Sequence, residues 1–271
     1  MFVQRALITF TVGPLALYLI VLGGWFYFLP ITAVLLLGVY EYTHMIQKIG
    51  WQMPIWLLLP IVLIFSIDGQ WPHRHIGSLI MVGSLLIVMA YALWLYEKRL
   101  SNTVPADWLA MMGAIVLLGW LASHFFRLRG LADMAWQWTM LAMVTTWMAD
   151  SAAYVVGKFL TNNVFGRHHL SPRLSPNKTI EGYVGGILFG TSISILLASW
   201  INLPLWPAFI LGLLITIISP LGDLAISLLK REAGVKDSGV LFPGHGGALD
   251  RIDSLVWSVT IAYYLVLFIN S

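Results

Sequence analysis

The chain has 271 residues, of which 59% are hydrophobic and only 10% are charged, with 13 tryptophans and a formal net charge of +3. A soluble chain is about a quarter charged, so this composition excludes a protein surrounded only by water and predicts an integral membrane protein. The lack of cysteine excludes disulfides, cysteine-ligated zinc and thiol catalysis, and leaves carboxylates, histidine, lysine and arginine for any chemistry.

We predict an all-α integral membrane protein with about nine transmembrane helices. A helix needs about 20 mostly apolar residues to cross a hydrocarbon core of roughly 30 Å. Such windows lie near residues 5–23, 25–45, 51–67, 76–96, 108–127, 134–157, 179–201, 205–230 and 252–270. The first window is too long and too apolar for a cleaved signal peptide, so we expect the mature protein to retain it.

The lysines and arginines are distributed unevenly between the two sides that nine spans define. One side carries twelve of the 15, namely Arg5, Lys48, Lys98, Arg99, Lys158, Arg167, Arg173, Lys178, Lys230, Arg231, Lys236 and Arg251. The other side carries Arg74, Arg127 and Arg129. By the positive-inside rule we expect the first side to be cytoplasmic, which places the N-terminus in the cytoplasm and the C-terminus outside.

Four acidic residues fall inside the apolar windows or at their ends: Glu41, Asp150, Glu181 and Asp223. An ionisable group within a membrane span is costly unless it is paired or hydrated, so these four are functional candidates. The acidic residues that flank segments, Asp68, Glu97, Asp107 and Asp133, are interpreted instead as solvated loop residues.

A polar stretch precedes the seventh window. Its Ser-Pro pairs preclude a continuous helix, so we expect a loop that returns to the membrane at Thr179. Lys178, Thr179 and Glu181 would then lie at a helix N-terminus, which favours phosphate. Arg167 and Arg173 have an alternative role near anionic lipid headgroups. The glycines spaced four apart in the following window, Gly182, Gly186 and Gly190, indicate close helix packing rather than ligand binding.

The most polar segment is "KDSGVLFPGHGGALDRID", from Lys236 to Asp253. Asp250 and Asp253 are three residues apart, so a continuous helix would present both on one face, towards the same membrane side as Asp223. Several carboxylates converging at membrane depth repel one another unless a cation intervenes. Oxygen ligands without cysteine suit Mg²⁺, which takes one or two carboxylates and completes its shell with water and substrate phosphates.

The surroundings of these carboxylates favour a phosphate-bearing substrate. Lys230, Arg231, Lys236 and Arg251 form a cationic cluster, and "PGHGG" offers backbone N–H groups to an anion. Lys230 follows Asp223 by about two helical turns, so the two could also pair. His245 could bind phosphate, orient a carboxylate or serve as an acid. The residues therefore predict a magnesium and phosphate site.

This pattern resembles the signature of the phosphatidate cytidylyltransferases, also called CDP-diacylglycerol synthases. The signature is S-x-x-K-R from Ser227, K-D at Lys236 and H-G-G-x-x-D-R-x-D from His245 to Asp253. Upstream, D-S-x-x-Y at Asp150 and S-P-x-K-T-x-E-G from Ser175 resemble two further motifs of that family. Ala248 departs from the larger aliphatic residue usual in the family, which affects packing. In the first half only the hydropathy and Glu41 match.

The resemblance implies that CTP and phosphatidate are converted to CDP-diacylglycerol and pyrophosphate. It implies a site with Mg²⁺ held by Asp223, Asp250 and Asp253, with a second cation left open, and a homodimer. The expected catalytic residues are Asp223, Lys230, Asp250 and Asp253. The expected substrate-binding residues are Asp150, Lys158, Lys178, Thr179, Glu181, Arg231, Lys236, His245, Gly246, Gly247 and Arg251. The partners would be CTP, phosphatidate and bilayer lipid, without nucleic acid.

We expect residues 1–130 to form an N-terminal transmembrane bundle and residues 131–271 a catalytic region with two cytoplasmic polar loops. The expected location is a bacterial plasma (inner) membrane, with the active site facing the cytoplasm. Two alternatives remain open. A CTP-dependent lipid kinase would release CDP in place of pyrophosphate. An ion-coupled transporter would bind its ion at Asp150 and Asp223 and predicts broken helices in two related halves.

Overall fold

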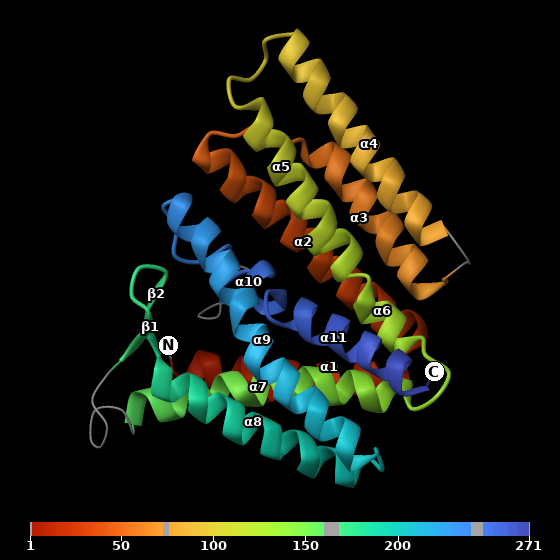
Figure 1. The fold of residues 1–271 in the computed structure, drawn as a ribbon, viewed down its shortest axis with the longest axis vertical. Coiled ribbons are helices and arrows are strands. Elements are labelled where there is room, and N and C mark those ends of the chain that lie inside the picture. The colour runs from red at the N-terminus through yellow and green to blue at the C-terminus, as the bar shows by residue number, and fades with distance from the viewer. Residues whose placement is uncertain (1, 73–75, 160–167, 240–245, 271) are drawn as a thin grey trace. The chain divides into compact units, whose positions relative to one another are not determined.

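The computed structural model of the chain is built mainly of helices (Figure 1). It describes residues 2–72, 76–159, 168–239 and 246–270, with side chains from residue 11 onward. In chain order the helices are α1 (Phe2–Leu22), α2 (Gly24–Ile49), α3 (Ile55–Gln70), α4 (Ile76–Glu97), α5 (Val104–Ala114), a π-helix (Ile115–Leu121), α6 (His124–Arg129), α7 (Ala135–Val155), α8 (Ile180–Trp200), α9 (Leu205–Glu232), α10 (Leu249–Ile252) and α11 (Leu255–Asn270).

Every predicted apolar window coincides with helical structure, but six helical stretches are long and apolar enough to cross a membrane within the part of the chain described. These stretches are Gly24–Ile49, Ile76–Glu97, Val104–Arg129, Ile180–Trp200, Leu205–Glu232 and Leu249–Asn270. The first and third windows correspond to the shorter apolar helices Thr11–Leu22 and Ile55–Gln70. The chain is an integral membrane protein with several apolar helices, whereas nine crossings and the orientation of the termini stay predictions.

The polar stretch before α8 contains a short hairpin, so the expectation of an all-α chain with an irregular loop there was incomplete. Strand β1 (His169–Ser171) pairs antiparallel with β2 (Ser175–Thr179), with His169 opposite Thr179 and Ser171 opposite Ser175. A residue that precedes proline is disfavoured in the helical region, which keeps the Ser-Pro steps extended. The hairpin ends at Thr179, the residue at which the return to the membrane was expected.

The chain divides into two compact units, each described here by itself. Unit 1 comprises Met1–Gly130 and Leu229–Ile252, and unit 2 comprises Leu131–Leu228 and Asp253–Ser271. The last turn of α9, α10 and the described residues between them therefore belong to the same unit as the N-terminal helices. The functional division into residues 1–130 and 131–271 stays a prediction.

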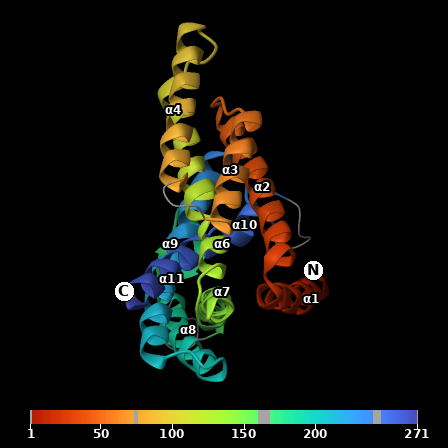
Figure 2. The same ribbon diagram turned by 90° about the vertical axis from the view of Figure 1, so that its right-hand side faces the viewer.

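In unit 1, helix α3 packs against α2 and α4, as the side view shows (Figure 2). At one end, the buried Asp107 at the start of α5 accepts hydrogen bonds from the Gln52 backbone N–H and the hydroxyls of Ser101 and Thr103. At another, the buried Asp68 of α3 pairs with Arg127. Their interpretation as solvated loop residues was wrong. Both carboxylates are buried, and hydrogen-bond donors that the fold brings into contact with them compensate for the burial.

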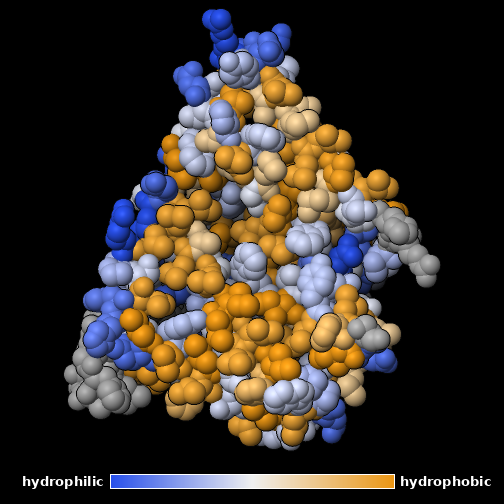
Figure 3. All heavy atoms as spheres, in the orientation of Figure 1, coloured by the Kyte–Doolittle hydropathy of each residue, from blue (hydrophilic) through white to orange (hydrophobic). Residues whose placement is uncertain are grey.

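The surface of unit 1 is consistent with contact with lipid. Helix α4 exposes Leu79, Val82, Leu86 and Leu93. Figure 3 shows hydrophobic side chains along this helix and hydrophilic ones at its end near the loop to α5. A soluble monomer rarely exposes so continuous an apolar surface, so this pattern is typical of a bilayer-facing helix.

In unit 2, helices α7 and α8 pack closely through glycines, as predicted. A Cβ atom added at Gly190 would lie 2.6 Å from Thr216 Cγ2 and 2.8 Å from Ala149 Cβ, and one added at Gly186 would lie 3.0 Å from the Ala149 carbonyl oxygen. Helix backbones approach this closely only where the intervening residues are small. The close packing of α7 and α8 sets the position of the α8 N-terminus, where the second predicted substrate-binding segment lies.

Candidate active site

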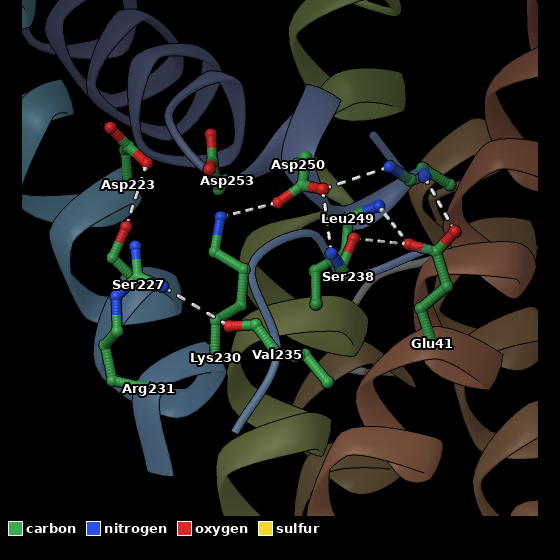
Figure 4. A network of polar contacts seen from close by, with 12 residues as sticks. Glu41, Asp223, Ser227, Lys230, Arg231, Val235, Ser238, Leu249, Asp250 and Asp253 are labelled. Carbon is green, nitrogen blue, oxygen red and sulfur yellow. Dashed lines mark hydrogen bonds and ion pairs between the residues drawn. The ribbon is translucent and has the colours of Figure 1, made fainter. Parts of the chain in front are cut away.

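The ion pair of Lys230 and Asp250 lies at the centre of the polar network in unit 1 (Figure 4). Lys230 Nζ, from the end of α9, is 2.7 Å from Asp250 Oδ1, in α10. The other oxygen, Oδ2, accepts the backbone N–H groups of Ser238 and Gly247 at 2.9 and 3.0 Å. The lysine and aspartate side chains are only 10% and 7% exposed, so the pair is largely shielded from solvent.

This arrangement corrects one expectation. We predicted that Lys230 could pair with Asp223, two helical turns away in the same helix, but its ammonium group bonds to Asp250. Spacing within one helix could not reveal that Asp250 of α10, 20 positions later in the chain, contacts Lys230.

The glycines of the "HGG" motif are required by the geometry around Asp250. Gly246 has φ +82°, a left-handed conformation that favours glycine, and a Cβ atom there would lie 2.4 Å from Asp250 Oδ2. A Cβ atom at Gly247 would lie 2.2 Å from Glu41 Oε2. Both glycines therefore let the backbone approach a carboxylate closely, and the Gly247 N–H bonds to Asp250, whereas phosphate binding by this segment stays a prediction.

Glu41 of α2 belongs to the same network; the sequence made it a functional candidate but assigned it no particular role. Its buried carboxylate accepts the backbone N–H groups of Ala248 and Leu249, each at 2.9 Å, and the hydroxyl of Ser238 at 2.7 Å. The available signal was an acidic residue within an apolar window. Its partners lie about 200 positions later in the chain, so no local pattern could identify them.

A second carboxylate and lysine pair lies in unit 2, where Lys178 of β2 bonds to Asp223 Oδ2 of α9. The Ser227 hydroxyl, one helical turn after Asp223, lies 3.4 Å from the other carboxylate oxygen. Both side chains of the ion pair are 29% exposed. Lys178, predicted to bind substrate, thus neutralises a carboxylate predicted to bind metal, so the two expected roles are linked.

Helix α8 begins directly after Thr179, where the sequence placed its start, and the Thr179 side chain caps it. The Thr179 hydroxyl accepts the Gly182 N–H at 3.1 Å, which satisfies one of the free donors of the first helical turn. Glu181 is paired with His168, next to the hairpin. A Cβ atom at Gly157 would lie 2.8 Å from the Thr179 hydroxyl oxygen, so the segment after α7 also contacts this cap closely.

The other predicted residues of unit 2 differ in exposure, and Asp253 is buried. Asp150 is exposed near the end of α7. The exposed Lys158 donates to the Tyr154 hydroxyl at 3.1 Å and lies over the rings of Tyr154 and Phe159. Asp253 Oδ1 accepts a hydrogen bond from the backbone N–H of Ser254 at 2.6 Å.

The shared helical face predicted for Asp250 and Asp253 is interrupted. Asp250 lies in α10, whereas Asp253 lies in the turn between α10 and α11. Within unit 2, Gly222 lies directly against the Asp253 carbonyl oxygen, because a Cβ atom there would be 2.4 Å from it. Asp253 and the residue before Asp223 are therefore neighbours.

Three predicted cations of unit 1 are exposed: Arg231, Lys236 and Arg251. Arg231 donates to the Val235 carbonyl oxygen at 3.5 Å. The predicted residue His245 lies outside the described residues. The exposed cations leave positive charge next to a shielded Lys230 and Asp250 pair, which suits an anionic substrate.

The donor set fits a magnesium ion that shares its ligands with a substrate. Within the described ranges, no group of three or more histidine, aspartate or glutamate side chains could hold a metal ion. Mg²⁺ needs only one or two carboxylates and takes its other ligands from water and phosphates. Among the described residues, Asp250 Oδ2 accepts two of the three hydrogen bonds to this carboxylate and Oδ1 accepts one, whereas a carboxylate offers about four acceptor positions.

The fold defines a helical membrane protein in which each unit carries a lysine-paired aspartate, and unit 1 adds exposed cations and a glycine-dependent turn, features suited to phosphate-bearing substrates. The chain belongs to the cytidylyltransferase family, whose model matches residues 3–269. This match confirms the family resemblance found in the signature residues.

The curated relatives of the chain include several bacterial proteins named phosphatidate cytidylyltransferase. The one from Synechocystis sp. is 34% identical over 93% of this chain and 92% of its own length. The one from Bacillus subtilis is 29% identical over 97% of each chain, and the one from Staphylococcus haemolyticus is 33% identical over 78% of this chain and 77% of its own. The similarity thus extends through the N-terminal half, where the signature motifs are absent.

Proposed function

We propose that this chain transfers the cytidylyl group of CTP to phosphatidate, giving CDP-diacylglycerol and pyrophosphate for phospholipid synthesis. The observation that carries the proposal is that signature residues from separate motifs converge on one shielded ion pair: Lys230 and Asp250, with the N–H of Gly247. The relatives named phosphatidate cytidylyltransferase, matched over most of this chain, support the same activity.

In this reaction the lipid phosphate attacks CTP directly, so the protein does not need to form a covalent intermediate. A phosphate oxygen of phosphatidate forms a bond to the α-phosphorus of CTP, and the bond from that phosphorus to the oxygen bridging to the β-phosphorus breaks. Pyrophosphate leaves with the bonding electron pair. The nucleophile is already an anion, so a strong general base is unnecessary. The main obstacle is repulsion between two anions, and enzymes overcome it by positioning and electrostatic stabilisation.

The cationic residues would reduce this repulsion. The exposed Arg231, Lys236 and Arg251 would attract CTP and stabilise the charge that grows on pyrophosphate. Lys178, with Thr179 at the capped start of α8, would contact the nucleotide phosphates. Lys230 would hold the Asp250 carboxylate in a fixed orientation, since the two are hydrogen-bonded.

The family to which the chain belongs typically uses a divalent metal, and we propose Mg²⁺ here. Asp250, with Asp223 or Asp253, would hold the ion, and a second cation is compatible with three carboxylates. When bound, Mg²⁺ would neutralise the triphosphate and increase the electrophilicity of the α-phosphorus. Asp150, Lys158, Glu181 and Gly246 keep their proposed roles in substrate binding.

The setting that we propose is a bacterial plasma membrane with the site facing the cytoplasm, where CTP is available. The charge bias of the loops and the bacterial sources of the relatives support it. The homodimer is a further proposal. Light scattering of the purified protein in detergent, corrected for bound detergent, would report a mass of two chains, whereas a mass of one chain would refute it.

Two positions of a radioactive label in CTP test the proposed reaction. With label at the α-phosphorus, we expect radioactivity to enter the lipid phase, and with label at the γ-phosphorus, we expect it to stay in water as pyrophosphate. A lipid kinase would give the opposite result, because the γ-phosphate would move to the lipid. Transfer of the γ-label would therefore overturn the proposal.

A further inference from the structure

Glu41 is a buried carboxylate on a helix far in sequence from every signature motif. Its carboxylate accepts the Ala248 and Leu249 backbone N–H groups and the Ser238 hydroxyl. The contact is tight, because a Cβ atom at Gly239 would lie 2.2 Å from Glu41 Oε1. Glu41 thus contacts both described segments that flank residues 240–245.

No ion pair among the described residues includes Glu41, so these hydrogen bonds are what compensates for the burial of its carboxyl group. A buried charge without its donors is costly, and hydrogen bonds to charged groups are stronger than neutral ones. Glu41 Oε1 accepts the Ala248 N–H, and Oε2 accepts the Leu249 N–H and the Ser238 hydroxyl, so the two oxygens together hold donors from both flanking segments in one orientation.

The same two segments also hold Asp250. Ser238 donates its backbone N–H to Asp250 and its hydroxyl to Glu41. Gly247 donates to Asp250, and the next residue, Ala248, donates to Glu41. Adjacent donors therefore connect the two carboxylates, and a shift of the segment at Glu41 must move the N–H groups that orient Asp250 (Figure 4).

We propose that Glu41 is a positioning residue for Asp250, through which helix α2 of the N-terminal half sets the orientation of the catalytic carboxylate. The proposal rests on the proposed function, since it assigns Asp250 to catalysis. It gives the N-terminal half a role in the reaction beyond anchoring the protein in the membrane.

The test compares Glu41→Gln with Asp107→Asn. Glutamine has nearly the same shape, but in either orientation its NH₂ group faces a backbone N–H, that of Ala248 or that of Leu249, so one donor loses its acceptor. Asp107 is a matched control, because it is also a buried carboxylate of unit 1 with three hydrogen-bond donors, none of which contacts Asp250. Both variants replace one buried carboxyl group by an amide, and only the first disturbs the Asp250 segment.

Three quantities are measured for each variant in detergent: kcat and the half-saturating Mg²⁺ concentration for cytidylyl transfer, the thermal unfolding midpoint, and hydrogen–deuterium exchange of peptides covering 246–252. A displacement of about 1 Å at a reacting group can cost on the order of 10²-fold in rate. We expect Glu41→Gln to lower kcat by about that factor, to raise the Mg²⁺ requirement and to accelerate exchange at 246–252. We expect Asp107→Asn to lower the midpoint and leave the other quantities unchanged.

Equal losses of kcat in both variants, or unchanged exchange at 246–252 in Glu41→Gln, would overturn the positioning role. If Glu41→Gln does not fold, Ser238→Ala decides, because it removes one of the three donors to Glu41 and keeps the backbone bond to Asp250. We expect a smaller change in the same direction, and no change in kcat or exchange would count against the role. A folded wild-type protein without cytidylyl transfer would refute the proposed function, while the exchange rates would still report on the contact with Glu41.

Discussion

Replacement of Gly247 by alanine tests how closely the network around Asp250 must be packed. The added Cβ atom would lie 2.2 and 2.4 Å from the two carboxylate oxygens of Glu41 and 2.4 Å from the Ser238 hydroxyl oxygen, whereas ordinary contacts begin near 3.4 Å. Either the backbone or the Glu41 and Ser238 side chains must therefore move by about 1 Å, and both movements disturb the hydrogen bonds that hold the segment around Asp250. Overpacking of this kind costs about 1–3 kcal/mol of stability, and a displacement of 1 Å costs on the order of 10²-fold in rate.

The assay is the steady-state rate of lipid labelling by CTP carrying label at the α-phosphorus, at saturating CTP and phosphatidate. Gly83→Ala in α4 is the control, because nothing lies within 4 Å of a Cβ atom there. We expect Gly247→Ala to lose about two orders of magnitude in kcat while the protein stays folded, and Gly83→Ala to behave as wild type. A Gly247→Ala enzyme with full activity would refute the inference that this segment orients Asp250.

Three further predictions concern other parts of the site. Lys178→Ala should raise the KM for CTP by roughly 10- to 100-fold, which corresponds to the loss of one charge-assisted hydrogen bond. A variant in which only the use of phosphatidate changes would contradict the assignment of Lys178 to nucleotide binding. Gly190→Ala should lower the thermal unfolding midpoint, because the added methyl group forces α7 and α8 apart at a cost of about 1–3 kcal/mol in stability. An unchanged midpoint would count against the close packing of these helices. Removal of divalent ions with EDTA should abolish activity and added Mg²⁺ should restore it; turnover that persists in EDTA would exclude the metal role.

The sequence predicted what depends on local pattern. Apolar windows gave the positions of the helices, since a buried or lipid-facing helix requires a long apolar run. The spacing of Gly182, Gly186 and Gly190 correctly predicted close helix packing. The signature residues led to the family, which the match over residues 3–269 confirms.

The pairing of charges could not be predicted, because it depends on contacts between distant segments. Lys230 pairs with Asp250 across the segment after α9, and Lys178 of the hairpin pairs with Asp223. The burial of Asp68 was missed for the same reason, since its partner Arg127 lies 59 positions later. Composition identifies which groups are costly to bury, and only the fold shows which donors compensate for them.

The helix break between α10 and α11 was also missed. A carboxylate at Asp253 that accepts the N–H of the next residue competes with helical hydrogen bonding, and the turn at Asp253 and Ser254 lies at this position. The apolar run through residue 270 concealed this turn, because hydropathy reports burial and not backbone continuity.

The most direct test of the central claim compares wild type with Asp250→Asn in mixed micelles containing phosphatidate, Mg²⁺ and CTP labelled at the α-phosphorus. Folding of both proteins is verified by their elution from gel filtration and by thermal unfolding. We predict that wild type transfers label to lipid with an equal amount of pyrophosphate, and that folded Asp250→Asn transfers none. Full activity in the variant would remove Asp250 from the reaction, and a folded wild type that labels no lipid would contradict the proposed function itself.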